Sequence, residues 1–187
     1  MAENLNDVNV PKMRELDQVV RQNPSLARAT MKASSTWHRG TKAVIEVGRM
    51  DAGGQNFFPP TRKFVMVTDD PDLLGGVDSA PTPAETLVAA LAGCLTSGIA
   101  ANAALFGVPL DQIGIELEAD LDFRGVLGHD KSVRSGFSDI RYTVTIQSPA
   151  PEDKVRKCKE TIDRKSPVRD TIANPVNITS KFVYKPR

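Results

Sequence analysis

The chain has 187 residues, which is enough for one domain with a short appendage. Its 24 Lys and Arg residues balance 23 Asp and Glu residues, so charge does not favour nucleic acid or an anionic membrane as a partner. Two cysteines in dissimilar surroundings do not form a secreted disulfide framework, and the N-terminus lacks the apolar segment of a signal peptide. We therefore expect a cytoplasmic, reducing setting.

Residues 1–25 are predicted to form a helical appendage to a main domain at 26–187. Between Val8 and Asn23, apolar residues recur at helical spacing, and Pro24 stops the pattern. The next part of the chain is predicted to be extended in three segments, at 26–37, 41–47 and 63–68. Loops are predicted to follow the second and third of these segments, at 48–60 and 69–81.

The stretch 82–108 is long and apolar, with no charge after Glu85. Thr82, Pro83 and Glu85 have the pattern of a capping box with proline in the first turn, and Gly107 ends the helix. A helix that is apolar on every face is either buried on all sides or spans a membrane. Its many Ala, Gly and small polar residues make it weakly hydrophobic, so we predict the central helix of a soluble core.

After this helix the apolar period changes from 3.6 to 2. Residues 113–123 and 140–146 alternate between apolar and polar side chains, which predicts a hairpin with a long connection at 124–139. The remaining chain is predicted as a helix, a short helix with Ser166 as N-cap, and a last strand, at 151–164, 167–173 and 176–184.

This order of elements predicts an α+β fold, in which an antiparallel sheet wraps around a long central helix. A single small chain has too few strands to cover a helix that is apolar on every face. An intertwined homodimer would supply the missing cover, and we expect one.

The sequence offers little for a metal or cofactor site. His38 and His129 are isolated, and no Cys/His spacing suggests zinc. No Gly-rich phosphate loop follows a strand, so we expect no nucleotide and no other cofactor. Cys158 shares an apolar helical stripe with Val155 and Ile162, which indicates a core residue.

Three stretches together resemble the OsmC/organic hydroperoxide resistance family. They read PTPAETLVAALAGCLTSGIA, DLDFRGVLGHDKSVRSGFSDIRYTVTI and SPVRDTIANPVNITSKFV. The resemblance covers roughly residues 30–185 and leaves the N-terminal helix outside. It implies an interwoven α+β homodimer with two equivalent sites at the interface. In active members of the family a peroxidatic cysteine attacks a hydroperoxide, a second cysteine forms a disulfide with it, and an external dithiol reduces that disulfide.

The resemblance places Cys94 at the peroxidatic position. The family's second cysteine precedes a Pro-Val pair, and here that position is Ser166, whose hydroxyl cannot form a disulfide. An arginine from an early strand or loop activates the first cysteine, and Arg39 and Arg49 are the candidates here. A cysteine in the middle of an apolar helix stays inert without a nearby cation, so this arginine decides whether Cys94 is a nucleophile.

The family's activating glutamate lies ten residues before the cysteine, where this chain has Ala84. Glu85 is the available carboxylate, and we include it as a candidate catalytic residue. Nine residues are about two and a half helical turns, so Glu85 would point away from Cys94, and the capping box is the favoured interpretation.

Two functions remain open. The first is a thiol-dependent hydroperoxide reductase in oxidative stress, with Cys94 as its single peroxidatic cysteine and an external thiol as reductant. The second is a non-catalytic dimer that binds a small apolar ligand at its interface. Ala84 and Ser166 favour the second function, whereas the retained Cys94 favours the first.

Overall fold

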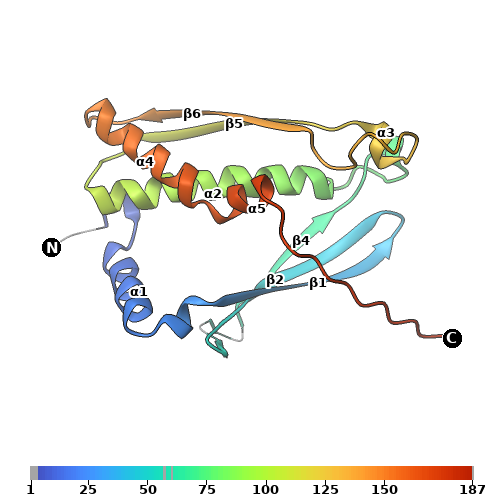
Figure 1. Cartoon of the computed structure of the whole chain (residues 1–187), viewed down its shortest axis with the longest axis horizontal. Coiled ribbons are helices and arrows are strands. Elements are labelled where there is room, and N and C mark those ends of the chain that lie inside the picture. Colours follow the sequence, from blue (N-terminus) through green and yellow to red (C-terminus); the bar gives the residue numbers. More distant parts are fainter. Residues whose placement is uncertain (1–3, 57, 60, 187) are drawn as a thin grey trace.

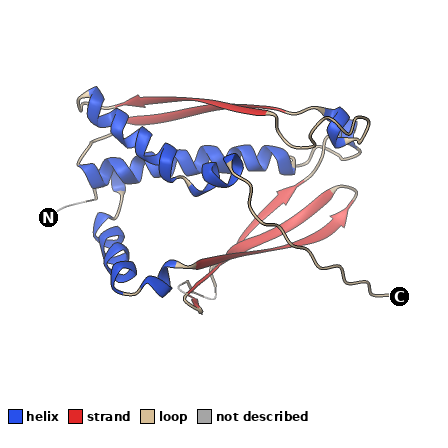
Figure 2. Cartoon of the chain, viewed as in Figure 1, coloured by secondary structure: helices blue, strands red, loops and turns tan. Residues whose placement is uncertain are grey.

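The computed structural model describes residues 4–56, 58–59 and 61–186. It has an α+β fold with antiparallel sheets and one long helix, α2, at its centre (Figure 1). The β5–β6 hairpin lies along one side of α2, and a four-stranded sheet, β1 to β4, lies on the other side (Figure 2). The elements are η1 (Leu5–Asp7), α1 (Val10–Gln22), η2 (Pro24–Ala27), β1 (Ala29–Arg39), β2 (Lys42–Ala52), β3 (Gln55–Asn56), β4 (Phe64–Thr68), η3 (Asp72–Leu74), α2 (Pro83–Phe106), β5 (Gln112–Asp120), α3 (Phe123–Val126), β6 (Asp139–Gln147), α4 (Glu152–Lys165) and α5 (Pro167–Ala173).

The predicted ends of α2 are confirmed. The Glu85 backbone N–H donates to Thr82 Oγ1 at 3.1 Å, and the Thr82 N–H donates back to Glu85 Oε2 at 2.7 Å. These two bonds complete the capping box. At the other end, Gly107 takes the left-handed conformation, with a φ of 71°, that ends helices most readily.

One face of α2 forms the core together with α4 and the inner face of the β5–β6 hairpin. The two strands pair in register from Gln112 opposite Gln147 to Asp120 opposite Asp139, so the predicted hairpin is confirmed. Alternate side chains of each strand face the helices, as the period of 2 requires. The buried cluster consists of Leu91, Leu95, Ile99, Ala103, Val108, Cys158 and Ile162.

Gly98 lets α4 approach α2 closely. A Cβ atom added at Gly98 would lie 2.1 Å from Ile162 Cδ1 and 2.3 Å from its Cγ1. Any side chain at this position would therefore overlap the end of the Ile162 side chain, which would have to move. The close approach matters for the site described below, because Cys94 is one turn before Gly98 and Ser166 directly follows α4.

The opposite face of α2 is open in the single chain. Only 28% of its most apolar 18-residue window is buried, so one copy leaves much of the helix uncovered, and the predicted burial on all sides stays a prediction for the dimer. Small residues form this face, and Ala89, Ala90, Gly93 and Ser97 are exposed. Among the described residues α2 is also the one helix long and apolar enough to cross a membrane, a test that core helices of soluble proteins pass as well.

The predicted loop at 48–60 is wrong in its first part, because two features of the glycines were missed. Gly48 sits in a β-bulge opposite Lys32 and Ala33, which lets β2 continue to Ala52. Gly53 and Gly54 then form a two-residue turn, with φ angles of 57° and 79°, that joins β2 to the short β3. Two positive φ values are what a tight hairpin of this length needs.

The predicted last strand, 176–184, is not paired with any described strand of the same chain. Residues 174–186 run as an extended, exposed tail away from α5 (Figure 1). Its apolar side chains are strongly exposed, with Ile178 at 87% and Phe182 at 88%. The alternating pattern indicates that the segment can form a strand. A strand also needs a neighbouring strand to pair with, and none of the described strands of this chain lies beside the tail.

The helix predicted near the N-terminus is present as α1, and one side chain of η1 ties this part of the chain to the turn after the central helix. Asn6 Nδ2 donates to the Val108 carbonyl at 3.0 Å, while its Oδ1 accepts from the Leu110 N–H at 2.9 Å. Asn6 has a φ of 58°, a conformation that asparagine tolerates better than most residues. This contact holds η1 against the turn between α2 and β5.

A buried carboxylate fixes the loop that leads into α2. Asp69 is 1% exposed and accepts hydrogen bonds from Thr41 Oγ1 at 2.7 Å, from Ser79 Oγ at 2.7 Å and from the Ser79 N–H at 3.2 Å. It thereby joins the start of β2, the end of β4 and the residues before Thr82. The hydrogen bonds from Ser79 and Thr41 hold the pKa of Asp69 well below its usual range.

We expect Asp69→Asn to lower the thermal unfolding midpoint by several degrees at pH 7. The asparagine amide would place an N–H donor against the groups of Thr41 and Ser79 that donate to the carboxylate. The folded pKa lies below the unfolded value of about 3.9. The carboxylate therefore stabilises the fold above about pH 4, and this contribution is lost as pH falls toward the folded pKa. The difference in unfolding midpoint between wild type and variant should become smaller below pH 4. Asp72→Asn, in the same loop, is the control. If the unfolding midpoints of wild type and Asp69→Asn depended on pH in the same way, the stabilising role of the Asp69 carboxylate would be contradicted.

Candidate functional site

Cys94 and Ser166 meet where α2 crosses the junction of α4 and α5. The Cys94 Sγ lies 3.1 Å from the Ser166 Oγ, within hydrogen-bond distance for a sulfur atom. Cys94 is partly buried, and Ser166 is 1% exposed. Two residues that are 72 positions apart in the sequence are thus brought into contact.

The backbone holds Ser166 from both sides. Its N–H donates to the Ile162 carbonyl at 2.8 Å, which ends α4, and its carbonyl accepts from the Asp170 N–H at 2.9 Å. Its Oγ accepts from the Arg169 N–H at 3.1 Å, so the predicted N-cap of α5 is confirmed. One hydroxyl therefore caps a helix and contacts the sulfur.

Glu85 lies in the first turn of α2, far from the sulfur. Nine residues at about 1.5 Å per residue place it roughly 13 Å from Cys94 along the helix axis. Its carboxylate is occupied by the Thr82 N–H and the Thr82 hydroxyl, which lower its pKa. The capping-box interpretation of Glu85 is confirmed, and the chain does not bring this carboxylate to Cys94.

The two candidate arginines lie in the other layer of the molecule. Arg39 ends β1, and Arg49 lies on β2 opposite Lys32. Neither forms a hydrogen bond or ion pair with Cys94 in the part of the chain that the structure describes. A third arginine, Arg62, lies in the connection before β4, donates from Nη1 to the Gly48 carbonyl at 2.6 Å and stacks on Phe58 and Phe64. The choice between Arg39 and Arg49 stays a prediction.

Cys158 is a core residue, as predicted. It is fully buried in α4, its Sγ–H donates to the Lys154 carbonyl at 3.3 Å, and burial raises the pKa of its thiol. Eight residues at about 1.5 Å each separate it from Ser166 by roughly 12 Å along the helix. Because a disulfide needs α-carbons within about 7 Å of each other, Cys158 is badly placed to pair with Cys94.

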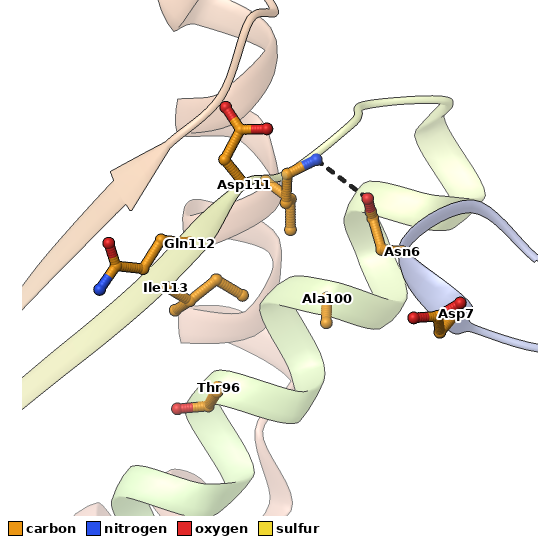
Figure 3. A pocket seen from close by; sticks show the side chains of 8 residues that line it. Asn6, Asp7, Thr96, Ala100, Asp111, Gln112 and Ile113 are labelled. Atoms are coloured by element: carbon orange, nitrogen blue, oxygen red, sulfur yellow. Dashed lines mark hydrogen bonds between the residues drawn. The ribbon is translucent and has the colours of Figure 1, made fainter.

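A shallow cavity of about 350 Å³ lies between α2, the start of β5 and the N-terminal residues (Figure 3). Asn6 and Asp7 of the appendage line it, together with Thr96 and Ala100 of α2 and the residues that lead into β5. Thr96 and Ala100 follow Cys94 by two and six residues, so they are rotated from it by roughly 200° and 240° around the helix axis. The cavity is therefore separate from the Cys94–Ser166 contact.

The sequence missed that the two roles of Ser166 coincide. The Ser-Pro pair indicated an N-cap, and the family resemblance indicated a position near Cys94, but neither signal predicted that the capping hydroxyl also touches the sulfur. In the described part of the chain, no group of three His, Cys, Asp or Glu side chains is arranged to hold a metal ion.

Comparison with known protein families gives a match to the model described as OsmC-like protein, over residues 76–181. This chain belongs to the OsmC-like family. The matched range includes α2, the hairpin and both helices that place Ser166. A sequence search among curated proteins gives no match.

Solved structures with the same fold include other OsmC-like proteins. An OsmC-like protein from Mycoplasma pneumoniae is 10% identical, with a TM-score of 0.56 over 78% of this chain and 89% of that one. A putative osmotic stress induced and detoxification response protein from Psychrobacter arcticus 273-4 is 15% identical, with a TM-score of 0.56 over 78% and 90%. An organic hydroperoxide resistance protein from Legionella pneumophila is 17% identical, with a TM-score of 0.50 over 76% and 88%. At these identities the likeness shows the fold.

We expect Ser166→Cys to pair with Cys94 under mild oxidation, because the two side chains already point at each other at 3.1 Å. A disulfide needs only about 1 Å of further approach. Intact mass should fall by two hydrogens per chain, and alkylation of Cys94 should be lost until a reductant is added. Ser166→Thr is the matched control and should keep the mass of the reduced chain. A reactive, reduced Cys94 in oxidised Ser166→Cys would contradict the geometry.

Proposed function

We propose that this OsmC-like protein reduces organic hydroperoxides through Cys94 alone, with an external thiol as reductant. The observation that carries the proposal is the contact between the Cys94 sulfur and the Ser166 hydroxyl. Cys94 is only partly buried, and its sulfur sits beside the residue that takes the second-cysteine position in the family resemblance. A hydroperoxide resistance protein among the structures of the same fold is consistent with this role.

The chemistry follows from a thiolate with no second sulfur beside it. The Cys94 thiolate attacks the outer peroxide oxygen, an S–O bond forms as the O–O bond breaks, and the alkoxide takes a proton from water. The cysteine becomes a sulfenic acid and the hydroperoxide becomes an alcohol. One external thiol then displaces water to form a mixed disulfide. A second thiol takes the first away as a disulfide and restores Cys94.

We further propose that the protein works as an intertwined homodimer. The exposed face of α2 consists of small residues, and a Cβ atom added at Gly93 would meet no atom within 4 Å. Apolar side chains of β1 and of the tail are also uncovered, with Trp37 at 73% exposed. A second copy could cover these surfaces at once, and Cys94 would then lie at the edge of the interface. Such an interface could bring Arg39 or Arg49 of a partner toward the sulfur.

The separation of Cys94 from Arg39, Arg49 and Glu85 in one chain favours a second candidate function. Without a cation near the sulfur, Cys94 would be a structural thiol. The protein would then be a dimer that binds a small apolar ligand at its interface. The oxidation experiment below separates the two functions.

We expect stoichiometric cumene hydroperoxide to oxidise Cys94 within minutes. With a small thiol present, intact mass should show a mixed disulfide, and without it the sulfinic acid should accumulate, since no second thiol traps the sulfenic acid. A bond between Cys94 and Cys158 is not expected. Cys94→Ser is the control and should abolish hydroperoxide consumption, whereas Cys158→Ser should leave it unchanged. An unchanged mass for the wild type would favour the binding function instead.

We expect sedimentation at micromolar concentration to show a dimer, with an interface of the obligate class above about 2,000 Å². Gly93→Leu adds a bulky side chain to the open face of α2 and should weaken the dimer by blocking close approach of the helices. Glu160→Leu adds the same side chain to an exposed position of α4 and serves as the control. A compact, well-folded wild-type monomer would overturn the proposal.

A further inference from the structure

We infer that Ser166 is a positioning residue that donates its hydroxyl hydrogen to the Cys94 sulfur and so holds that sulfur as a hydrogen-bond acceptor. The inference rests on the proposed function in one respect, because the sulfur gains a chemical role only if Cys94 reacts. It concerns a residue that differs from the family's disulfide-forming cysteine. The serine would then take an active part in the site in place of the missing sulfur.

The direction of this hydrogen bond follows from the partners that the Ser166 hydroxyl has. The contact of 3.1 Å between Sγ and Oγ allows either atom to donate. The Ser166 Oγ already accepts the Arg169 N–H at 3.1 Å, and the hydroxyl carries a single hydrogen that must also find a partner. Cys94 Sγ is the acceptor that the described residues offer to it.

The burial of Ser166 indicates the same direction for the hydrogen bond. Ser166 is 1% exposed, so water cannot easily satisfy its O–H group. If Cys94 donated to Ser166 instead, the O–H of a buried serine would be left without an acceptor, which costs free energy. When the sulfur accepts, the Ser166 hydroxyl is satisfied both as donor and as acceptor, and a donor aimed at the sulfur stabilises negative charge on it.

The packing of two helices holds the Ser166 hydroxyl in a fixed position. The backbone of Ser166 is held by Ile162 and Asp170, at the junction of two helices. Ile162 in turn lies against Gly98, one turn from Cys94, where no side chain intervenes. The donor is therefore placed by packed helices, and a donor fixed before the reaction stabilises charge without a cost of rearrangement.

A purely structural role for Ser166, as the N-cap of α5, makes a different prediction. Glycine is nearly as good an N-cap as serine but has no hydroxyl, whereas threonine keeps both the cap and the donor. Ser166→Gly therefore removes the proposed donor with little loss of the cap. Ser166→Thr should keep the reactivity of the Cys94 sulfur, because it keeps the hydroxyl. Ser166→Ala removes both the N-cap and the donor.

The test measures the rate of Cys94 alkylation by iodoacetamide against pH, in the full chain with Cys158→Ser as background. The pH of half-maximal rate should rise by about one unit in Ser166→Gly and Ser166→Ala, which corresponds to a tenfold change in thiolate stability. Ser166→Thr should stay near the background protein. Because the readout is the position of the pH profile, a change in access to the sulfur does not imitate it. Circular dichroism of each variant checks that the fold is kept.

The outcomes separate this inference from the proposed function. A profile that does not move in Ser166→Gly, or one that moves equally in Ser166→Thr, would overturn the role of Ser166 even if the wild type reduces hydroperoxides. A shifted profile in a protein that consumes no hydroperoxide would support the pairing of Ser166 with Cys94 and overturn the peroxidase instead.

Discussion

The contact between Gly98 and Ile162 decides how closely α4 lies on α2, and much of the site depends on that distance. A larger residue at position 98 would overlap the Ile162 side chain and disturb the packing of α4 on α2 that places Ser166 beside Cys94. The same packing buries Cys158 and encloses the inner face of the hairpin. A chemical contact between two small polar groups thus depends on an apolar contact one turn away, as is common where protein interiors are closely packed.

The elements of this fold were largely predictable because their signals are local. The capping box at Thr82 and Glu85 and the alternation in β5 and β6 depend on neighbouring residues only. The errors occurred where backbone freedom or distant partners decide. Gly48 and Gly53 suggested a loop, although a bulge and a tight turn use the same residue type to extend a sheet.

The site was less predictable than the fold for the same reason. The family resemblance identified the positions of Cys94 and Ser166, but the distance between them results from helix packing that no local pattern encodes. The open face of α2 shows the same limit. Its small residues predict a close neighbour, yet the identity of that neighbour depends on surfaces that a single sequence does not pair.

The hydrogen bonds of Asn6 have a consequence for the order in which this chain folds. They join residues that are 102 and 104 positions apart, so the intervening chain must be closed into a loop before they form. The turn between α2 and β5 carries the two backbone groups that Asn6 binds, and this turn arises from contacts that are local in sequence. Contacts at long sequence separation form late when they depend on local ones. We therefore expect the appendage to dock late, on a main domain whose central helix is already in place.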